Sequence, residues 1–91
     1  MDNEEKRKKF MELVENNLTP HQFKTKLIQE FGWHILTKQV NDEPFEVTFF
    51  ESIDDYEIDD VLTESHGFTS DEAIQTGLNN IKFYYKTKYE L

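Results

Sequence analysis

The stretch "WHILTKQVNDEPFEVTFFES" (residues 33–52) decides the fold, because it has the pattern of two strands joined by a tight turn. "WHILTKQV" is rich in β-branched and aromatic residues, "NDEP" has turn chemistry, and "FEVTFFES" (45–52) alternates, with Val47 and Phe49 on one face. The stretch therefore predicts a β-hairpin. Phe50 falls on the face opposite Phe49, so it either covers a second surface of the sheet or marks a bulge.

Upstream of this hairpin, the sequence predicts two helices. Residues 3–17 carry an apolar stripe at helical spacing that begins at Phe10. "TPHQ" (19–22) supplies a capping threonine, a first-turn proline and the glutamine of a capping box. A second helix is therefore expected from there to about Phe31, with Gly32 as its left-handed C-terminal cap.

Downstream, "GFTSDEAIQTGLNNIKFYYK" (67–86) predicts the last helix. Thr69 is suited to cap it, with Glu72 three residues later. Its apolar stripe consists of Ile74, Leu78, Ile81 and Tyr85. Gly77 costs about 1 kcal/mol relative to alanine inside a helix, so we expect it to mark a close approach of the sheet.

The segment that contains "SIDDYEIDDV" (52–61) is the least decided. In residues 55–65, Tyr56 and Ile58 alternate with acidic residues, as in a third strand, although a helical turn would also direct Ile58 inward together with Val61. We favour the strand. The expected fold is then a single α+β domain over residues 1–91, in the order α-α-β-β-β-α, with a small antiparallel sheet packed against helices.

Composition narrows the class of protein. The chain has 91 residues and no Cys, which excludes disulfides and thiolate metal sites, and its thirteen aromatic residues supply core area. Its first residues, "MDNEEKRKKF", carry no apolar signal region, and no apolar run approaches the roughly 18 residues of a membrane span. We expect a cytoplasmic protein with no membrane contact.

The negative charge is concentrated in the middle of the chain. Residues 39–76 hold twelve Asp and Glu and no Lys or Arg, whereas the net charge of the whole chain is −9. A field of this sign repels nucleic acid and membranes and attracts basic partners. The charge therefore indicates a basic protein partner, and no direct nucleic-acid contact.

A divalent-ion binder or a carboxylate-dependent enzyme is a less favoured alternative. Asp55, Glu57 and Asp59 match positions 1, 3 and 5 of a calcium-binding EF-hand loop, but Asp60 replaces the required glycine and His66 the required glutamate.

The three histidines, His21, His34 and His66, fall on a predicted helix, a strand and a loop without a metal-binding spacing. The acidic stretch also lacks a basic residue to stabilise a transition state. The sequence therefore predicts no metal site, no cofactor and no catalytic residues, and the chain is expected not to be an enzyme.

The last segment takes part in several family resemblances. The order of elements over residues 20–86, ending in "GFTSDEAIQTGLNNI", resembles a double-stranded-RNA-binding domain. That family places basic residues at the start of its last helix, where this chain has Ser70, Asp71 and Glu72, so the resemblance does not imply RNA binding.

The same segment is similar to the "G-(F/Y)-x-S-x-E-E-A-I-x-x-G-L" endings of small phage and prophage proteins, and in outline to the end of HicB-type antitoxins. The resemblance is carried by Gly67, Phe68, Ser70, Asp71 to Ile74, Gly77 and Leu78. It implies a mobile-element origin, and it makes an antitoxin or another regulatory partner protein the alternative function.

The acidic residues lead to the main hypothesis. If the third strand turns Tyr56 and Ile58 inward, Glu46, Glu57 and Asp59 face outward together. Acidic, Cys-poor composition and non-enzymatic character resemble uracil-glycosylase inhibitors and several anti-CRISPR proteins, which implies a DNA-mimicking inhibitor of a basic host protein. The predicted partner-binding residues are Asp42, Glu43, Glu46, Phe50, Glu51, Asp54, Asp55, Tyr56, Glu57, Asp59, Asp60 and Glu64, with Phe50 and Tyr56 as exposed aromatic contacts.

Overall fold

The computed structural model describes residues 3–39 and 41–89, and within them it has four helices and one three-stranded antiparallel sheet. β2 is the central strand, paired with β1 on one side and β3 on the other. The elements are α1 (Asn3–Val14), α2 (Pro20–Phe31), β1 (His34–Lys38), β2 (Phe45–Phe50), α3 (Ile53–Glu57), β3 (Thr63–Gly67) and α4 (Ser70–Tyr89). The α+β class and the order α-α-β-β-β-α are confirmed, with α3 inserted between the last two strands.

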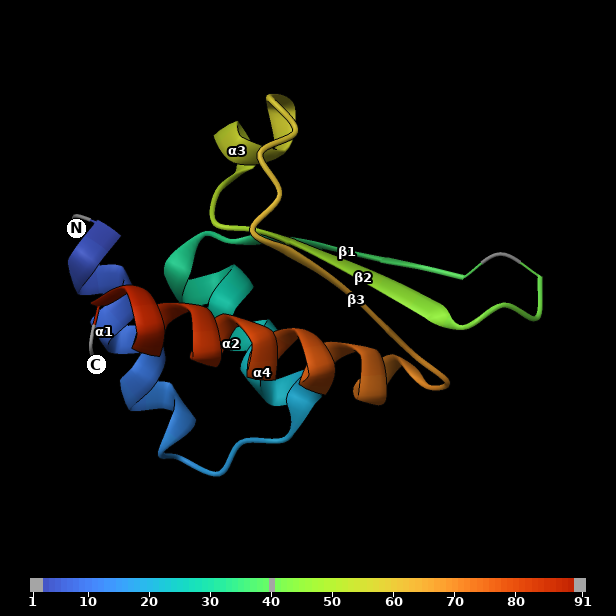
Figure 1. The fold of residues 1–91 in the computed structure, drawn as a ribbon, viewed down its shortest axis with the longest axis horizontal. Helices are drawn as coiled ribbons and strands as arrows, with labels where there is room; N and C mark the ends of the chain where they lie inside the picture. The colour runs from blue at the N-terminus through green and yellow to red at the C-terminus, as the bar shows by residue number, and fades with distance from the viewer. Residues whose placement is uncertain (1–2, 40, 90–91) are drawn as a thin grey trace.

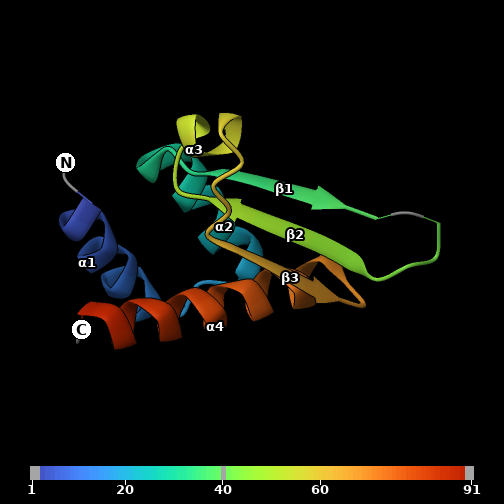
Figure 2. The same cartoon turned by 45° about the horizontal axis from the view of Figure 1, so that its top comes forward.

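The helices form a layer on one face of the sheet. α4 runs beneath the strands, α2 packs beside it, and α1 lies against the end of α4 (Figures 1 and 2). α3 stands apart from this layer, at the end of the sheet where β2 stops. No helix in the described ranges is long and apolar enough to cross a membrane.

The local signals at α2 are confirmed in detail. The Thr19 hydroxyl accepts a hydrogen bond from the Gln22 backbone N–H at 3.2 Å, and the Gln22 side chain accepts one from the Thr19 N–H at 3.0 Å. Gly32 ends the helix with φ 72° and ψ 21°, a conformation that glycine adopts without steric cost. α2 therefore has both predicted boundaries.

The core lies between the sheet and the helix layer. Val47 and Phe49 of β2 point into it, as predicted, and both are fully buried. Phe10 joins α1 to this core: its ring is stacked on Trp33 at 5.7 Å and meets the edge of Tyr85 at 5.2 Å. The remaining members are Phe23, Leu27, Ile35, Ala73, Ile74, Leu78 and Ile81.

Gly77 is a point of close approach between α4 and the sheet. A Cβ atom at this position would overlap the ring of Phe49 and lie 2.7 Å from Ser65 Oγ. The Ser65 hydroxyl donates a buried 2.6 Å hydrogen bond to the Ala73 carbonyl, which further ties β3 to the helix. The expectation that Gly77 marks contact with the sheet is confirmed.

The predicted strand over residues 55–65 is wrong for residues 55–62, whereas residues 63–65 belong to β3. The chain forms α3 at Ile53–Glu57, then a turn, and β3 begins only at Thr63. Ser52 caps the helix, its hydroxyl accepting a 3.0 Å hydrogen bond from the Asp55 N–H. Carboxylates in the first turn of a helix are also favoured by the helix dipole. These local signals prevail over the alternation of Tyr56 and Ile58, whose side chains are 41% and 73% exposed.

Phe50 covers a second surface of the sheet, which was the first of its two predicted alternatives. Its side chain is only 3% exposed because α3 lies over it, with the Tyr56 ring 5.3 Å away in an edge-on contact. The His34 ring completes this small cluster, 4.2 Å from that of Tyr56. The prediction of Phe50 as an exposed contact for a partner is therefore wrong.

Candidate functional site

Residues 53–61 form a projection at one end of the sheet, which we call the acidic knob (Figure 1). It comprises α3 and the turn that follows, and it contains no Lys or Arg. Four large apolar side chains are exposed on it: Ile53, Tyr56, Ile58 and Val61 are 50%, 41%, 73% and 40% exposed. Interleaved with them are the carboxylates of Asp54, Asp55, Glu57, Asp59 and Asp60.

The backbone of the acidic knob is held by its own hydrogen bonds. The Ile58 N–H donates to the Asp54 carbonyl at 3.2 Å, and the Asp60 N–H donates to the Asp55 carbonyl at 2.8 Å. Asp59 reverses the chain with φ 58°, a left-handed conformation that Asp and Asn tolerate better than most residues. The carboxylates are therefore displayed from a defined scaffold.

Beneath the knob, Arg7 of α1 contacts both α4 and the segment between β2 and α3. Arg7 of α1 lies 3.2 Å from the carboxylate of Glu51, and the two side chains are only 14% and 18% exposed. The guanidinium carbon also sits 5.4 Å from the centre of the Tyr85 ring. Burial disfavours the Arg7 charge, but Glu51 more than offsets this and raises the pKa of the guanidinium.

This pairing changes the role of Glu51. Its charge is compensated by Arg7 and its side chain is mostly covered, so it cannot contribute to a free acidic surface as predicted. A hollow of about 400 Å³ separates the pair from the knob. It is lined by Arg7, Glu51, Asp55, Asp60, Val61, Leu62 and Tyr84.

Tyr85 makes the fold sensitive to alkaline pH. Burial raises the pKa of its phenol, and the Glu51 charge raises it further, so the folded state keeps the phenol neutral. In the unfolded chain, the Tyr85 phenol ionises near pH 10. The contribution of Tyr85 to the free energy of unfolding is therefore expected to be fully present below pH 10. Above pH 10 it is expected to fall by up to about 1.4 kcal/mol per pH unit.

Denaturant unfolding at pH 8, 10 and 11 measures this dependence. Tyr85→Phe is expected to show a shallower loss of stability above pH 10 than the parent chain, because it has no phenol to ionise at this position. Tyr84→Phe, a neighbouring change on α4, is expected to keep the parent slope. Equal slopes for Tyr85→Phe and the parent would contradict the assignment.

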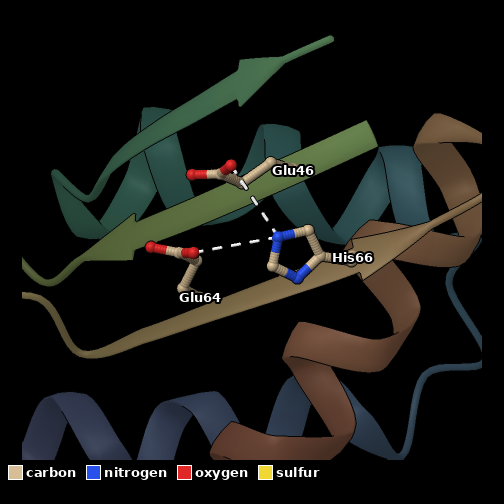
Figure 3. Close-up of side chains that lie close together, drawn as sticks. All are labelled: Glu46, Glu64 and His66. Atoms are coloured by element: carbon tan, nitrogen blue, oxygen red, sulfur yellow. Dashed lines mark ion pairs between the residues drawn. The ribbon is translucent and has the colours of Figure 1, made fainter. Parts of the chain in front are cut away.

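A second group of polar side chains lies on the face of the sheet opposite the helices. Glu46 of β2 is directly across from His66 of β3, and Glu64 is on the same face two residues earlier. Figure 3 shows the His66 ring with its Nε2 directed at both carboxylates, at 3.7 Å from Glu46 Oε2 and 3.8 Å from Glu64 Oε1. Beside them is a hollow of about 240 Å³ lined by Lys38, Glu43, Pro44, Glu46 and His66.

The twelve predicted site residues do not form one continuous surface. Asp54, Asp55, Tyr56, Glu57, Asp59 and Asp60 are together in the acidic knob, whereas Glu46 and Glu64 are on the open sheet face. Asp42 and Glu43 are exposed in the β1–β2 turn, at the opposite end of β2 from α3. Phe50 and Glu51 are covered. The knob is therefore the part of the predicted site that the fold brings together.

The position of His66 within a strand was not predicted from the sequence. His66 was placed in a loop because the third strand was predicted too early; in β3, the "ESH" alternation puts Glu64 and His66 on one face. The exposure of Ile53 and Ile58 was missed for the same reason. No protein-family model matches the chain, and neither the curated proteins nor the solved structures include a significant match.

Proposed function

We propose that this protein is a non-enzymatic binding module whose acidic knob docks on a basic, nucleic-acid-binding surface of another protein. The observation that carries the proposal is the composition of the knob: five carboxylates alternate with four exposed apolar side chains on one short projection. Exposed apolar groups rimmed by charge are typical of protein–protein contact sites.

The charge of the knob favours a protein partner over nucleic acid or an anionic membrane. Both polyanions are repelled by five carboxylates that have no Lys or Arg among them. A protein surface that binds phosphates presents Lys and Arg, and these side chains pair equally with carboxylates. Such a partner would be attracted over a distance by charge and then held by apolar contacts.

The exposed apolar side chains of the knob are the groups that we expect the partner to bury. Ile58 is at the turn of the knob and is 73% exposed, more than any other apolar residue of the projection. Burying an exposed side chain of this kind contributes about 1.5–3 kcal/mol. Ile58 is therefore the expected anchor, and the surrounding carboxylates set the partner's charge. The proposed role is that of a mobile-element inhibitor that occupies the partner's nucleic-acid site.

A neutralised knob tests this proposal. The variant Asp54→Asn, Glu57→Gln, Asp59→Asn, Asp60→Asn removes four charges, and asparagine at 59 retains tolerance of the left-handed backbone. A matched control removes four exposed carboxylates from α1, the turn after it, and α2: Glu4→Gln, Glu12→Gln, Glu15→Gln and Glu30→Gln. Both variants have the same net charge, so only the position of the charge differs.

Parent and variants are immobilised and exposed to lysate of the source cell at low salt, and retained proteins are eluted with duplex DNA. We expect the parent and the control to retain the same nucleic-acid-binding protein and DNA to release it. The neutralised knob is expected to bind that protein at least about tenfold more weakly, equivalent to about 1.4 kcal/mol. Equal binding by the neutralised knob, or retention that DNA does not reverse, would refute the proposal.

A further inference from the structure

We propose that Glu46, Glu64 and His66 form a binding site for a divalent transition-metal ion of the zinc type. The three side chains come from the paired strands β2 and β3, and their nearest donor atoms all lie within 4.8 Å of one another. One imidazole nitrogen and two carboxylate oxygens are a donor set that zinc accepts. None of the three residues belongs to the acidic knob.

The separations match a shared ion better than direct hydrogen bonds. His66 Nε2 is 3.7 Å from Glu46 Oε2 and 3.8 Å from Glu64 Oε1, beyond the 2.7–3.2 Å range of a hydrogen bond. Zinc bonds of about 2.0–2.2 Å in a tetrahedral site place neighbouring donor atoms roughly 3.3–3.6 Å apart. The two distances from His66 Nε2 are therefore close to those between ligand atoms that share one ion.

The backbone fixes the arrangement before any ion binds. Glu46 and His66 are direct partners across the β2–β3 ladder, and Glu64 follows the same face at the two-residue repeat of a strand. The side chains of Glu46, Glu64 and His66 are 36%, 47% and 58% exposed, so solvent can reach the site. Three protein donors leave a fourth position for water, which the adjoining hollow can hold.

The charge of the site suits a divalent ion, and its donor set distinguishes zinc from calcium. Two carboxylates and a neutral imidazole contribute −2, which a divalent ion balances. Lys38 of β1 is the cross-strand partner of Glu46, and its positive charge disfavours a bound cation. Glu43, at the edge of the hollow, favours one. Calcium requires six to eight oxygen ligands, and this site presents one nitrogen and two carboxylates. The donor set therefore favours a transition metal over calcium.

Calorimetric titration of the untagged chain with Zn²⁺ tests the site. The parent is expected to bind one ion per chain at pH 7.5. His66→Ala, Glu64→Gln and Glu46→Gln are each expected to bind it at least about tenfold more weakly, because even partners outside the first ligand shell contribute about 10–100-fold to metal affinity. All three positions are solvent-accessible, and circular dichroism establishes that each variant is folded.

Two control variants make the outcome decisive. His21→Ala, at an exposed histidine on α2, and the neutralised knob are both expected to retain the parent affinity. No saturable binding by the parent, or an equal loss in the neutralised knob and in His66→Ala, would overturn the assignment.

Discussion

Replacing Phe10 by alanine is expected to lower the free energy of unfolding by about 3–5 kcal/mol. The ring is fully buried and contacts Phe23, Trp33 and Tyr85, which belong to α2, the segment before β1, and α4. Removing it leaves a cavity where α1 joins the core. Because a small domain is stable by only about 5–15 kcal/mol in total, this single change removes a large part of its stability.

Denaturant unfolding of the Phe10→Ala variant measures the loss, and Phe83→Ala provides the matched control. Phe83 is 73% exposed on α4, so its truncation removes few contacts and is expected to change stability by less than about 0.5 kcal/mol. If the two variants were equally stable, the assignment of Phe10 as the residue that fastens α1 to the core would be wrong.

Gly77→Ala is expected to destabilise the protein by about 2 kcal/mol although alanine is the better helix former. The substitution gains about 1 kcal/mol of helix propensity. Against this, the new methyl group overlaps the buried Phe49 ring and crowds Ser65, whose hydroxyl is committed to the Ala73 carbonyl. Overpacking of a core costs about 1–3 kcal/mol or more, and here two neighbours must move.

A control on the same helix separates propensity from packing. Asn80→Ala, at an exposed position of α4, is expected to be neutral or stabilising by a few tenths of a kcal/mol. Adding Phe49→Leu to Gly77→Ala is expected to relieve the overlap. The double variant should then lose less stability than the two single variants together, by about 0.5–3 kcal/mol of coupling. Strict additivity would exclude the proposed clash.

Features that depend on a few neighbouring residues could be predicted from the sequence, except where two local patterns competed. Thr19, Gly32 and Gly77 were interpreted correctly because a cap or a close approach requires a particular residue type at that position. At Tyr56 and Ile58 two local patterns competed: alternation indicated a strand, while the Ser52 cap and the following carboxylates favoured a helix. The structure has the helix, so the strand predicted at these two residues was wrong.

The candidate metal site could not be predicted from local sequence patterns. Glu46 and His66 are 20 positions apart in the chain and meet only because Glu46 pairs with His66 in the β2–β3 register. That register depends on where β3 begins. Because the third strand was predicted at residues 55–65, the pairing of Glu46 with His66 was not predicted. The acidic knob was partly foreseen, since its carboxylates were expected to face outward, but the exposure of its apolar residues follows from α3 standing outside the core.

The connection between β2 and β3 is far longer than the sheet requires. Phe49 already pairs with Thr63, and adjacent antiparallel strands can be joined by two residues. Residues 51–62 are thus an elaboration of a hairpin, and most of the core lies in other parts of the chain. Substitutions in the acidic knob are therefore expected to leave the packing of the core unchanged.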